Sequence, residues 1–333
     1  MIKAFAALEA KKDLEIFEFE AQPLKPNEVQ IKVESCGICH SDISAIDNSW
    51  GASKFPMVAG HEIIGKVIGI GSEVSLHKVG NRVGLGWHSG YCNSCEHCNL
   101  GDNNFCRSTK KTVYSQHGGF AEEVSADEVS IIPIPEGVKH EDAGPLLCGG
   151  ITVFTPIVEF DINSSHKVGI IGIGGLGHLA IQFCKALGCH VTAFTSSSDK
   201  NHLLTSLGAD EIVSSTDKTS IDTLGAQFDF LISTVNVKLD WNLFLNIIKP
   251  RGRLHFVGAV LDPIAVSVFS LMGGRRSISG SPVGSPKNIT KMLNFCAKHK
   301  ISPLVEHFKF DDINTAIKKL RNNKVRFRAV LTW

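Results

Sequence analysis

The feature that most constrains the fold is a glycine-rich turn between an apolar segment and an amphipathic one. Gly172, Gly174 and Gly177 form the pattern G-x-G-x-x-G, directly after residues 168–171 (VGII) and at the start of residues 176–188. The first glycine permits a tight turn, the second lets a phosphate approach the backbone, and the third allows close packing of helix on strand. The helix N-terminus then turns its positive dipole end toward the phosphates. Because strand, turn and helix occur in this order, we predict a dinucleotide-binding unit.

The flanking sequence continues the same alternation of strand and helix. After the turn come a predicted strand at 190–196, a helix at 201–209 and a strand at 211–215, and then apolar segments at 228–235, 243–250 and 253–260. Continuous apolar strands that alternate with helices are typical of a doubly wound parallel sheet. Residues 1 to about 140 differ, since short apolar segments there are separated by Gly, Pro, Asn and Asp. That pattern predicts a β-rich barrel or sandwich.

Four closely spaced cysteines indicate a metal site. Cys92, Cys95, Cys98 and Cys106 form C-x2-C-x2-C-x7-C among turn-forming Gly, Asn and Asp residues. Four thiolates can surround one tetrahedral zinc and leave no position for water or substrate, so we predict a structural zinc. An iron–sulfur cluster, a nucleic-acid zinc ribbon and four unconnected thiols are the alternatives.

Three further residues form a dispersed candidate set: Cys39 in CGICHSD, His61 in AGHE and Cys148 in GPLLCGG. Each taken singly can be an ordinary core residue, because free cysteine is among the most buried residue types. Each also lies beside glycine or at a predicted strand end. Two thiolates and one imidazole leave the fourth position of a zinc ion open, and an open zinc is a Lewis acid for carbonyl and alkoxide oxygens.

The end of the second predicted parallel strand bears on the choice of cofactor. NAD-binding units usually carry Asp or Glu there, whereas this strand ends in Thr195, Ser196 and Ser197, with Lys200 nearby. Hydroxyls and an ammonium group suit a 2′-phosphate, so the sequence favours NADP(H) over NAD(H). An ordinary polar turn is one alternative, and Asp199, several residues late, as the acidic residue of an NAD-binding unit is another.

Composition excludes several classes of partner. The 333 residues carry 34 Lys and Arg against 33 Asp and Glu, a net charge of +1, without the basic excess of a nucleic-acid-binding surface. No apolar run approaches the roughly 20 residues that span a bilayer, and the first 20 residues do not resemble a signal peptide. We therefore expect a cytoplasmic protein with no nucleic-acid or membrane partner, whose 10 cysteines are metal ligands or core residues.

Taken together, these motifs resemble the medium-chain, zinc-containing alcohol dehydrogenase superfamily, and most closely its cinnamyl-alcohol-dehydrogenase branch. CGICHSD, GHE, the four-cysteine segment, GPLLCGGIT, GIGGLG and VRFRAVL occur in that family's order over nearly the whole chain. Within the branch, the sequence is most similar to bacterial NADPH-dependent aldehyde reductases of broad specificity. The resemblance implies a GroES-like domain of residues 1–147 and 283–333, with a zinc lobe at about 88–110, around a Rossmann domain of residues 148–282. It also implies a homodimer.

The resemblance further assigns roles to residues. Cys39, His61 and Cys148 would hold a catalytic zinc, Ser41 would relay a proton, Asp42 would hydrogen-bond His61, and Glu62 would lie behind the metal. His40 and Arg328 would face the cofactor pyrophosphate and Thr152 the nicotinamide, while Trp50 and Trp87 would line the substrate pocket. The remaining cofactor contacts would come from Gly172, Gly174, Gly175, Leu176, Gly177, Thr195, Ser196, Ser197, Lys200, Val257 and Val283.

The function that follows is reversible, zinc-dependent hydride transfer between NADP(H) and an aldehyde or primary alcohol, acting as an aldehyde reductase on aromatic or medium-chain aliphatic aldehydes. One departure is Ser44, which stands where many relatives carry a histidine of the proton relay. The segment between Cys106 and Gly118 is also shorter than in plant relatives, which argues against a strict monolignol substrate. An NAD-dependent alcohol dehydrogenase and a non-catalytic, zinc-stabilised dinucleotide-binding protein are the alternative functions.

Overall fold

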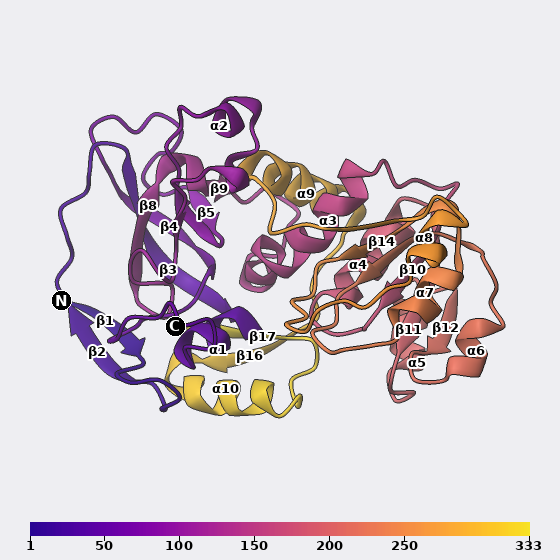
Figure 1. Ribbon diagram of the computed structural model, residues 1–333. Coiled ribbons are helices and arrows are strands. Elements are labelled where there is room, and N and C mark those ends of the chain that lie inside the picture. The colour runs from indigo at the N-terminus through magenta and orange to yellow at the C-terminus, as the bar shows by residue number, and fades with distance from the viewer. The chain divides into compact units, whose positions relative to one another are not determined.

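The computed structural model describes residues 1–333, which divide into two compact units. One unit contains residues 1–151 and 283–333, and the other contains residues 152–282. The first boundary falls inside helix α3 (Gly149–Glu159), whereas the sequence placed it just before that helix. Both chain termini belong to the discontinuous unit (Figure 1).

The unit of residues 152–282 is built on a six-stranded sheet in which every neighbouring pair is parallel. Its strands are β10 (Lys167–Ile171), β11 (His190–Thr195), β12 (Glu211–Ser214), β13 (Phe228–Ser233), β14 (Ile248–Phe256) and β15 (Ser277–Gly280). The spatial order β12-β11-β10-β13-β14-β15 is the doubly wound arrangement of a Rossmann sheet, and strand order reverses between β10 and β13. The predicted doubly wound sheet is therefore present.

Helices connect these strands as the sequence pattern requires. They are α4 (Gly177–Ala186), α5 (Asn201–Ser206), α6 (Lys218–Asp222), α7 (Trp241–Asn246) and α8 (Val268–Met272). Val168, Ile170 and Ile171 of β10 are fully buried, because helices cover a sheet whose strands are apolar on both faces. Helix α7 ends at Asn246 and β14 begins at Ile248, so the apolar segment 243–250 is part helix and part strand.

The discontinuous unit contains a seven-stranded sheet of order β16-β17-β3-β4-β5-β9, with β8 also paired to β3. Its strands are β3 (Glu28–Ile38), β4 (Glu62–Ile70), β5 (Arg82–Leu85), β8 (Glu123–Asp127), β9 (Ile131–Pro133), β16 (Val305–Lys309) and β17 (Arg328–Thr332). Val29, Ile31 and Val33 alternate with more exposed residues, which is the period of a strand with one face in a core. Because β17 pairs antiparallel with β3, the last residues of the chain complete the sheet begun near its start.

Smaller elements complete this unit. They are the hairpin of β1 (Ile2–Ala6) and β2 (Glu15–Phe19), the pair β6 (His88–Gly90) and β7 (Lys110–Lys111), and helices α1 (His40–Ile46), α2 (Glu96–Leu100), α9 (Pro286–His299) and α10 (Ile313–Arg321). The sequence analysis predicted neither the β1–β2 hairpin nor α10. The signal for α10 was present, since Ile313, Ala316, Ile317 and Leu320 recur at helical spacing and are buried. No helix combines the length and the apolar character needed to cross a membrane.

Candidate active site

Two thiols and an imidazole from distant parts of the sequence converge within the discontinuous unit. Cys39 follows β3, His61 precedes β4, and Cys148 lies between a short 3-10 turn and α3. The Sγ atoms of Cys39 and Cys148 are 3.9 Å apart, and His61 Nε2 lies 3.2 Å from Cys148 Sγ. With one Glu62 oxygen, these ligand atoms all lie within 4.8 Å of one another. The donor set fits a zinc ion held by two thiolates and one imidazole.

Asp42 organises this cluster through its carboxylate. One oxygen, Oδ1, accepts hydrogen bonds from His61 Nδ1 at 2.8 Å and from the Gly60 amide at 2.9 Å, and Oδ2 accepts from the Cys39 amide at 2.9 Å. The proton on Nδ1 leaves the Nε2 lone pair free for a metal. Asp42 therefore fixes the tautomer of His61 and the backbone beside two of the three ligands.

The thiols of the cluster differ in acidity. The pKa of Cys39 is held well below its usual range because its sulfur accepts a hydrogen bond from Cys148 and, to a smaller extent, interacts with His61, although burial opposes the shift. Cys148 shows the opposite shift: donation to Cys39 and burial raise its pKa. Both sulfurs would bind a metal ion as thiolates.

Glu62 and Arg328 form a buried ion pair next to the cluster. Arg328 Nη2 donates to Glu62 Oε1, and both side chains are almost completely buried. Burial raises the pKa of Glu62, and the guanidinium opposes that rise. Arg328 was expected at the cofactor pyrophosphate, and its pairing with Glu62 was not predicted, because the two residues lie 266 positions apart.

An aromatic group lies beside the cluster. The Trp87 ring packs edge-on against His61, with ring centroids 4.8 Å apart, and its centroid lies 6.2 Å from that of Trp50 and 6.2 Å from that of Tyr114. The centroids of Trp50 and Tyr114 are 6.5 Å apart. We call these three rings the aromatic wall. The sequence analysis selected the two tryptophans but missed Tyr114, which no local motif marks.

The four lobe cysteines also come together. The sulfur of Cys92 lies 3.4 Å from that of Cys106 and 3.9 Å from that of Cys98, which is 3.6 Å from Cys95. A left-handed Gly101 ends the short helix α2 that carries Cys98, and the β6–β7 pair closes the base of the lobe. Hydrogen bonds from the backbone of Ser94 and Cys95 lower the pKa of Cys92 to about 6. Four sulfurs arranged in this way can hold a tetrahedral metal with no open position.

The glycine-rich turn joins β10 to α4 in the other unit. Gly172 has φ +87°, and a side chain there would meet Val235, while a Cβ at Gly177 would lie 2.1 Å from the Gly172 carbonyl oxygen. A Cβ at Gly174 would meet nothing within 4 Å. Packing within the protein therefore requires the first and third glycines, whereas the second borders open space at the carboxyl edge of the sheet, where ligands of such folds bind.

The residues predicted to choose the cofactor lie at the end of β11. Thr195 is its last residue, and the Thr195 hydroxyl donates to the Ser197 carbonyl at 3.2 Å. Ser196 is exposed, and Lys200 precedes α5. Gly175, Leu176, Thr152 in α3 and Val257 after β14 are partly exposed in the same unit. His40, Ser41 and Val283 are exposed or partly exposed in the other unit, and their contacts with a cofactor stay predictions.

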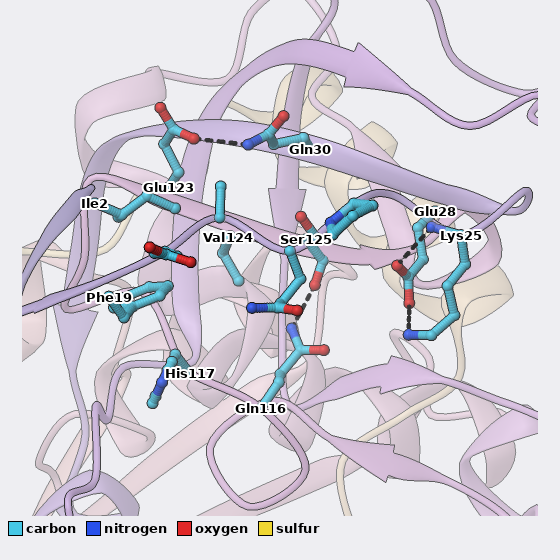
Figure 2. A pocket seen from close by; sticks show the side chains of 14 residues that line it. Ile2, Phe19, Lys25, Glu28, Gln30, Gln116, His117, Glu123, Val124 and Ser125 are labelled. Carbon is cyan, nitrogen blue, oxygen red and sulfur yellow. Dashed lines mark hydrogen bonds and ion pairs between the residues drawn. The ribbon is translucent and has the colours of Figure 1, made fainter.

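Two surface cavities lie away from these clusters. Figure 2 shows the first, of about 450 Å³, where the Phe19 and His117 rings are adjacent and Gln30 donates to Glu123. Two further pairs line it, with Lys25 bound to Glu28 and Gln116 bound to the Ser125 carbonyl. The second, of about 540 Å³, lies in the Rossmann-type unit and includes Ser215 and Thr216, which follow β12. Neither cavity is lined by a residue of the two metal-ligating clusters.

Comparison with known proteins agrees with this architecture. Residues 25–136 match the alcohol dehydrogenase GroES-like domain, and residues 175–298 match the zinc-binding dehydrogenase family. The chain is 50% identical to aldehyde reductase AdhA of Synechocystis over 100% of its own length and 99% of that protein. A cinnamyl alcohol dehydrogenase structure from Sorghum bicolor superimposes with a TM-score of 0.95 at 33% identity, covering 99% of this chain and 97% of the other. A Helicobacter pylori enzyme of the same kind, solved with NADP(H), gives 0.92 at 30% identity, covering 99% and 97%.

The chain therefore belongs to the medium-chain, zinc-containing alcohol dehydrogenase superfamily and, within it, to the cinnamyl-alcohol-dehydrogenase branch. It is a zinc-binding oxidoreductase with a GroES-like unit and a Rossmann unit. The fold class and the family expected from the sequence are both confirmed.

Proposed function

We propose that this protein is a zinc-dependent aldehyde reductase that uses NADPH and has broad specificity for aromatic and medium-chain aliphatic aldehydes. The observation that carries the proposal is the convergence of Cys39, His61 and Cys148, with Asp42 fixing the tautomer of the imidazole. A purely structural site has no need of three ligands with an open fourth position. The lobe, where all four ligands are sulfur, would hold the structural zinc.

The residues of the first cluster would hold zinc through the two sulfurs and His61 Nε2. When bound, the metal supplies Lewis acidity that draws electron density from a substrate carbonyl. Glu62 lies beside these ligands, and its pairing with Arg328 balances its charge in a buried site. The reaction consumes one aldehyde, one NADPH and one proton, and forms one alcohol and one NADP⁺.

Ser41 would supply the proton to the substrate oxygen. It is half-buried in the first turn of α1, two residues beyond Cys39. A positioned group of this kind contributes about 10²–10⁴-fold to the rate of proton transfer. Since Ser44 replaces the usual histidine, a proton from solvent would restore the Ser41 hydroxyl through water and the cofactor ribose, or through Ser44.

The cofactor preference rests on the end of β11. Thr195, Ser196 and Ser197 offer hydroxyls and Lys200 an ammonium group, and no carboxylate occupies the position that would repel a 2′-phosphate. The similar Helicobacter pylori enzyme was solved with NADP(H). The substrate class rests on the aromatic wall, because Trp87 beside His61, together with the two rings that pack on Trp87, would present apolar surface to a planar or aliphatic aldehyde.

The test follows the reduced cofactor by absorbance with the zinc-loaded protein. We expect benzaldehyde and hexanal to consume NADPH faster than NADH, and expect chelation of zinc to abolish both reactions. Faster turnover with NADH would overturn the cofactor assignment alone. If neither cofactor is consumed although two zinc ions are bound, the protein is a non-catalytic dinucleotide-binding protein.

We also propose a cytoplasmic homodimer. All 10 cysteines are free, which suits a reducing compartment. One of the two edge strands of the Rossmann sheet is β15, and α8, which directly precedes it, exposes large apolar side chains, among them Phe269 at 83%. An unpaired edge strand next to exposed apolar residues is suited to pairing with a second copy.

A further inference from the structure

The zinc lobe and the aromatic wall are parts of one continuous segment. Trp87 lies between β5 and β6, so it is the last residue before the lobe, and Tyr114 lies just after β7, where the lobe ends. Between them the four cysteines close the lobe, and β6 pairs with β7 through His88 with Lys111 and Gly90 with Lys110. Trp87 and Tyr114 therefore lie on the two chain segments that flank the lobe.

Thr112 joins these two segments by hydrogen bonds next to the aromatic wall. Its amide donates to the Trp87 carbonyl oxygen at 2.9 Å, and its hydroxyl donates to the Gly86 carbonyl oxygen at 2.6 Å. Thr112 is fully buried. Because a buried hydroxyl without a partner is costly, this bond holds the residues before β6 at a fixed distance from those after β7.

The position of Tyr114 depends on the same turn and on the wall itself. Its amide donates to the Lys111 carbonyl oxygen at 3.1 Å, so it is set by β7. Its hydroxyl is buried; burial raises the pKa of Tyr114, and an interaction with the Ser53 side chain opposes that rise. Ser53 lies in the loop after Trp50 and donates to the Ala45 carbonyl oxygen at 2.6 Å. Tyr114 thus lies between the lobe strands and the loop that carries the third ring.

From this connection we propose that the zinc lobe positions the substrate pocket, in addition to stabilising its own loop. The lobe metal fixes β6 and β7, Thr112 transmits their spacing, and Trp87 and Tyr114 are thereby held beside His61. The lobe then determines which aldehydes bind well. This inference rests on the proposed aldehyde reduction, and Thr112 is a positioning residue that touches neither substrate nor cofactor.

The experiment compares Thr112→Val, which removes the hydroxyl at nearly constant volume, with Thr112→Ser, which keeps it. The matched control is Thr192→Val, because Thr192 is also fully buried and donates its hydroxyl, to Glu211, in the other unit. We expect Thr112→Val to raise KM for benzaldehyde about ten-fold relative to acetaldehyde, within the range for altered fit in an apolar pocket. Its kcat for acetaldehyde and its two zinc ions should be retained, and Thr112→Ser and Thr192→Val should keep the wild-type KM ratio.

A second readout does not depend on activity. Thr112→Val should shift tryptophan emission, and the shift should vanish when the same substitution is made in a Trp87→Phe background. Cys106→Ser, which removes one lobe ligand, should bind one zinc instead of two and show the same spectral shift. If Cys106→Ser does not fold, the KM ratio and the tryptophan emission of the Thr112 variants test the proposal.

The proposal is overturned if Thr112→Val leaves both the KM ratio and the emission unchanged, or if Cys106→Ser loses the lobe zinc with no change in emission. If the wild-type protein reduces neither aldehyde, the proposed function fails. The tryptophan emission of the Thr112→Val and Cys106→Ser variants then still shows whether the lobe positions the aromatic wall.

Discussion

At the scale of single residues, Asp42 links local sequence to the chemistry of the site. Its carboxylate lies three residues after Cys39 and accepts hydrogen bonds from the backbone of that ligand, from Gly60 and from the His61 ring. Asp42 is completely buried, so its charge is compensated only by these donors and by the metal they help to organise. One side chain therefore holds two ligands in place.

We predict that Asp42→Asn weakens zinc binding at the first cluster about 10- to 100-fold, the usual effect of losing a hydrogen-bond partner of a metal-ligating histidine. The amide nitrogen would face a donor, and the His61 tautomer would no longer be fixed. Zinc retained against a competing chelator measures the change. Asp142→Asn is the control, because Asp142 is also buried in this unit but binds Lys139 and His307. Equal zinc retention in both variants would contradict the role of Asp42.

At the scale of elements, the turn between β10 and α4 separates a folding requirement from a binding requirement. Gly177 must lack a side chain because the Gly172 carbonyl oxygen occupies that space, whereas Gly174 borders open space. Glycine is therefore needed at these two positions of the motif for two different physical reasons. One concerns helix–strand packing, and the other concerns the approach of a ligand.

Gly177→Ala should lower the melting temperature by several degrees, since a Cβ would lie 2.1 Å from a backbone oxygen. Gly174→Ala should melt like the wild type and bind NADPH at least about ten-fold more weakly, because its methyl group would occupy the place of the pyrophosphate. Thermal unfolding and fluorescence titration with NADPH measure the two effects. A Gly174→Ala variant with wild-type affinity would show that the cofactor binds elsewhere.

A buried histidine, His255, lies on β14 where this strand pairs with β15. His255 contacts the Ser279 hydroxyl at 2.8 Å through Nδ1 and the Ser281 hydroxyl at 2.9 Å through Nε2. Burial, reinforced by Arg253, lowers its pKa from 6.5 to about 4. The unfolded chain therefore takes up this proton more readily than the folded chain, and the contribution of His255 to stability is lost as pH falls from 6.5 toward 4.

We expect the melting temperature of the wild type to fall more steeply between pH 7 and pH 5 than that of His255→Gln, which keeps polar groups near both serines but does not titrate. The difference between the two proteins at each pH isolates this residue from other titrating groups. His299→Gln, at an exposed position in α9, should follow the wild type. Parallel curves for wild type and His255→Gln would refute the assignment.

For the whole molecule, we propose that two copies associate through the β15 edge of the Rossmann sheet. β15 pairs only with β14, and α8 next to it exposes Val268, Phe269 and Met272. Such exposed side chains contribute little to a monomer, because burying them requires a second surface.

Phe269→Asp should therefore convert the dimer to a monomer, since a charge in an apolar interface loses its hydration without gaining a partner. Light scattering coupled to size exclusion measures the mass. Phe105→Asp is the control, because Phe105 is also an exposed aromatic residue but lies in the zinc lobe. A wild-type protein that elutes as a monomer, or a Phe269→Asp variant that remains dimeric, would rule out this interface.

Much of the candidate site could be predicted from short sequence motifs, and the residues that were missed were missed for one reason. The four lobe cysteines and the glycine turn are visible because their function needs residues close together in the chain. Tyr114 was missed because only its contacts with Trp50 and Trp87 make it part of the wall. The Arg328–Glu62 pair was missed for the same reason, since the two residues come together only because β17 and β4 both pair with β3.

The class of fold, the family, the candidate cysteine ligands and the glycine turn could all be predicted from sequence, because each depends on residue type and short-range spacing. The folded structure was needed to show which oxygen holds His61, what Arg328 binds, and how β6, β7 and Thr112 connect the zinc lobe to the aromatic wall. These features depend on side chains that meet across strands far apart in the sequence. No short segment contains both members of such a contact, and therefore no local pattern reveals it.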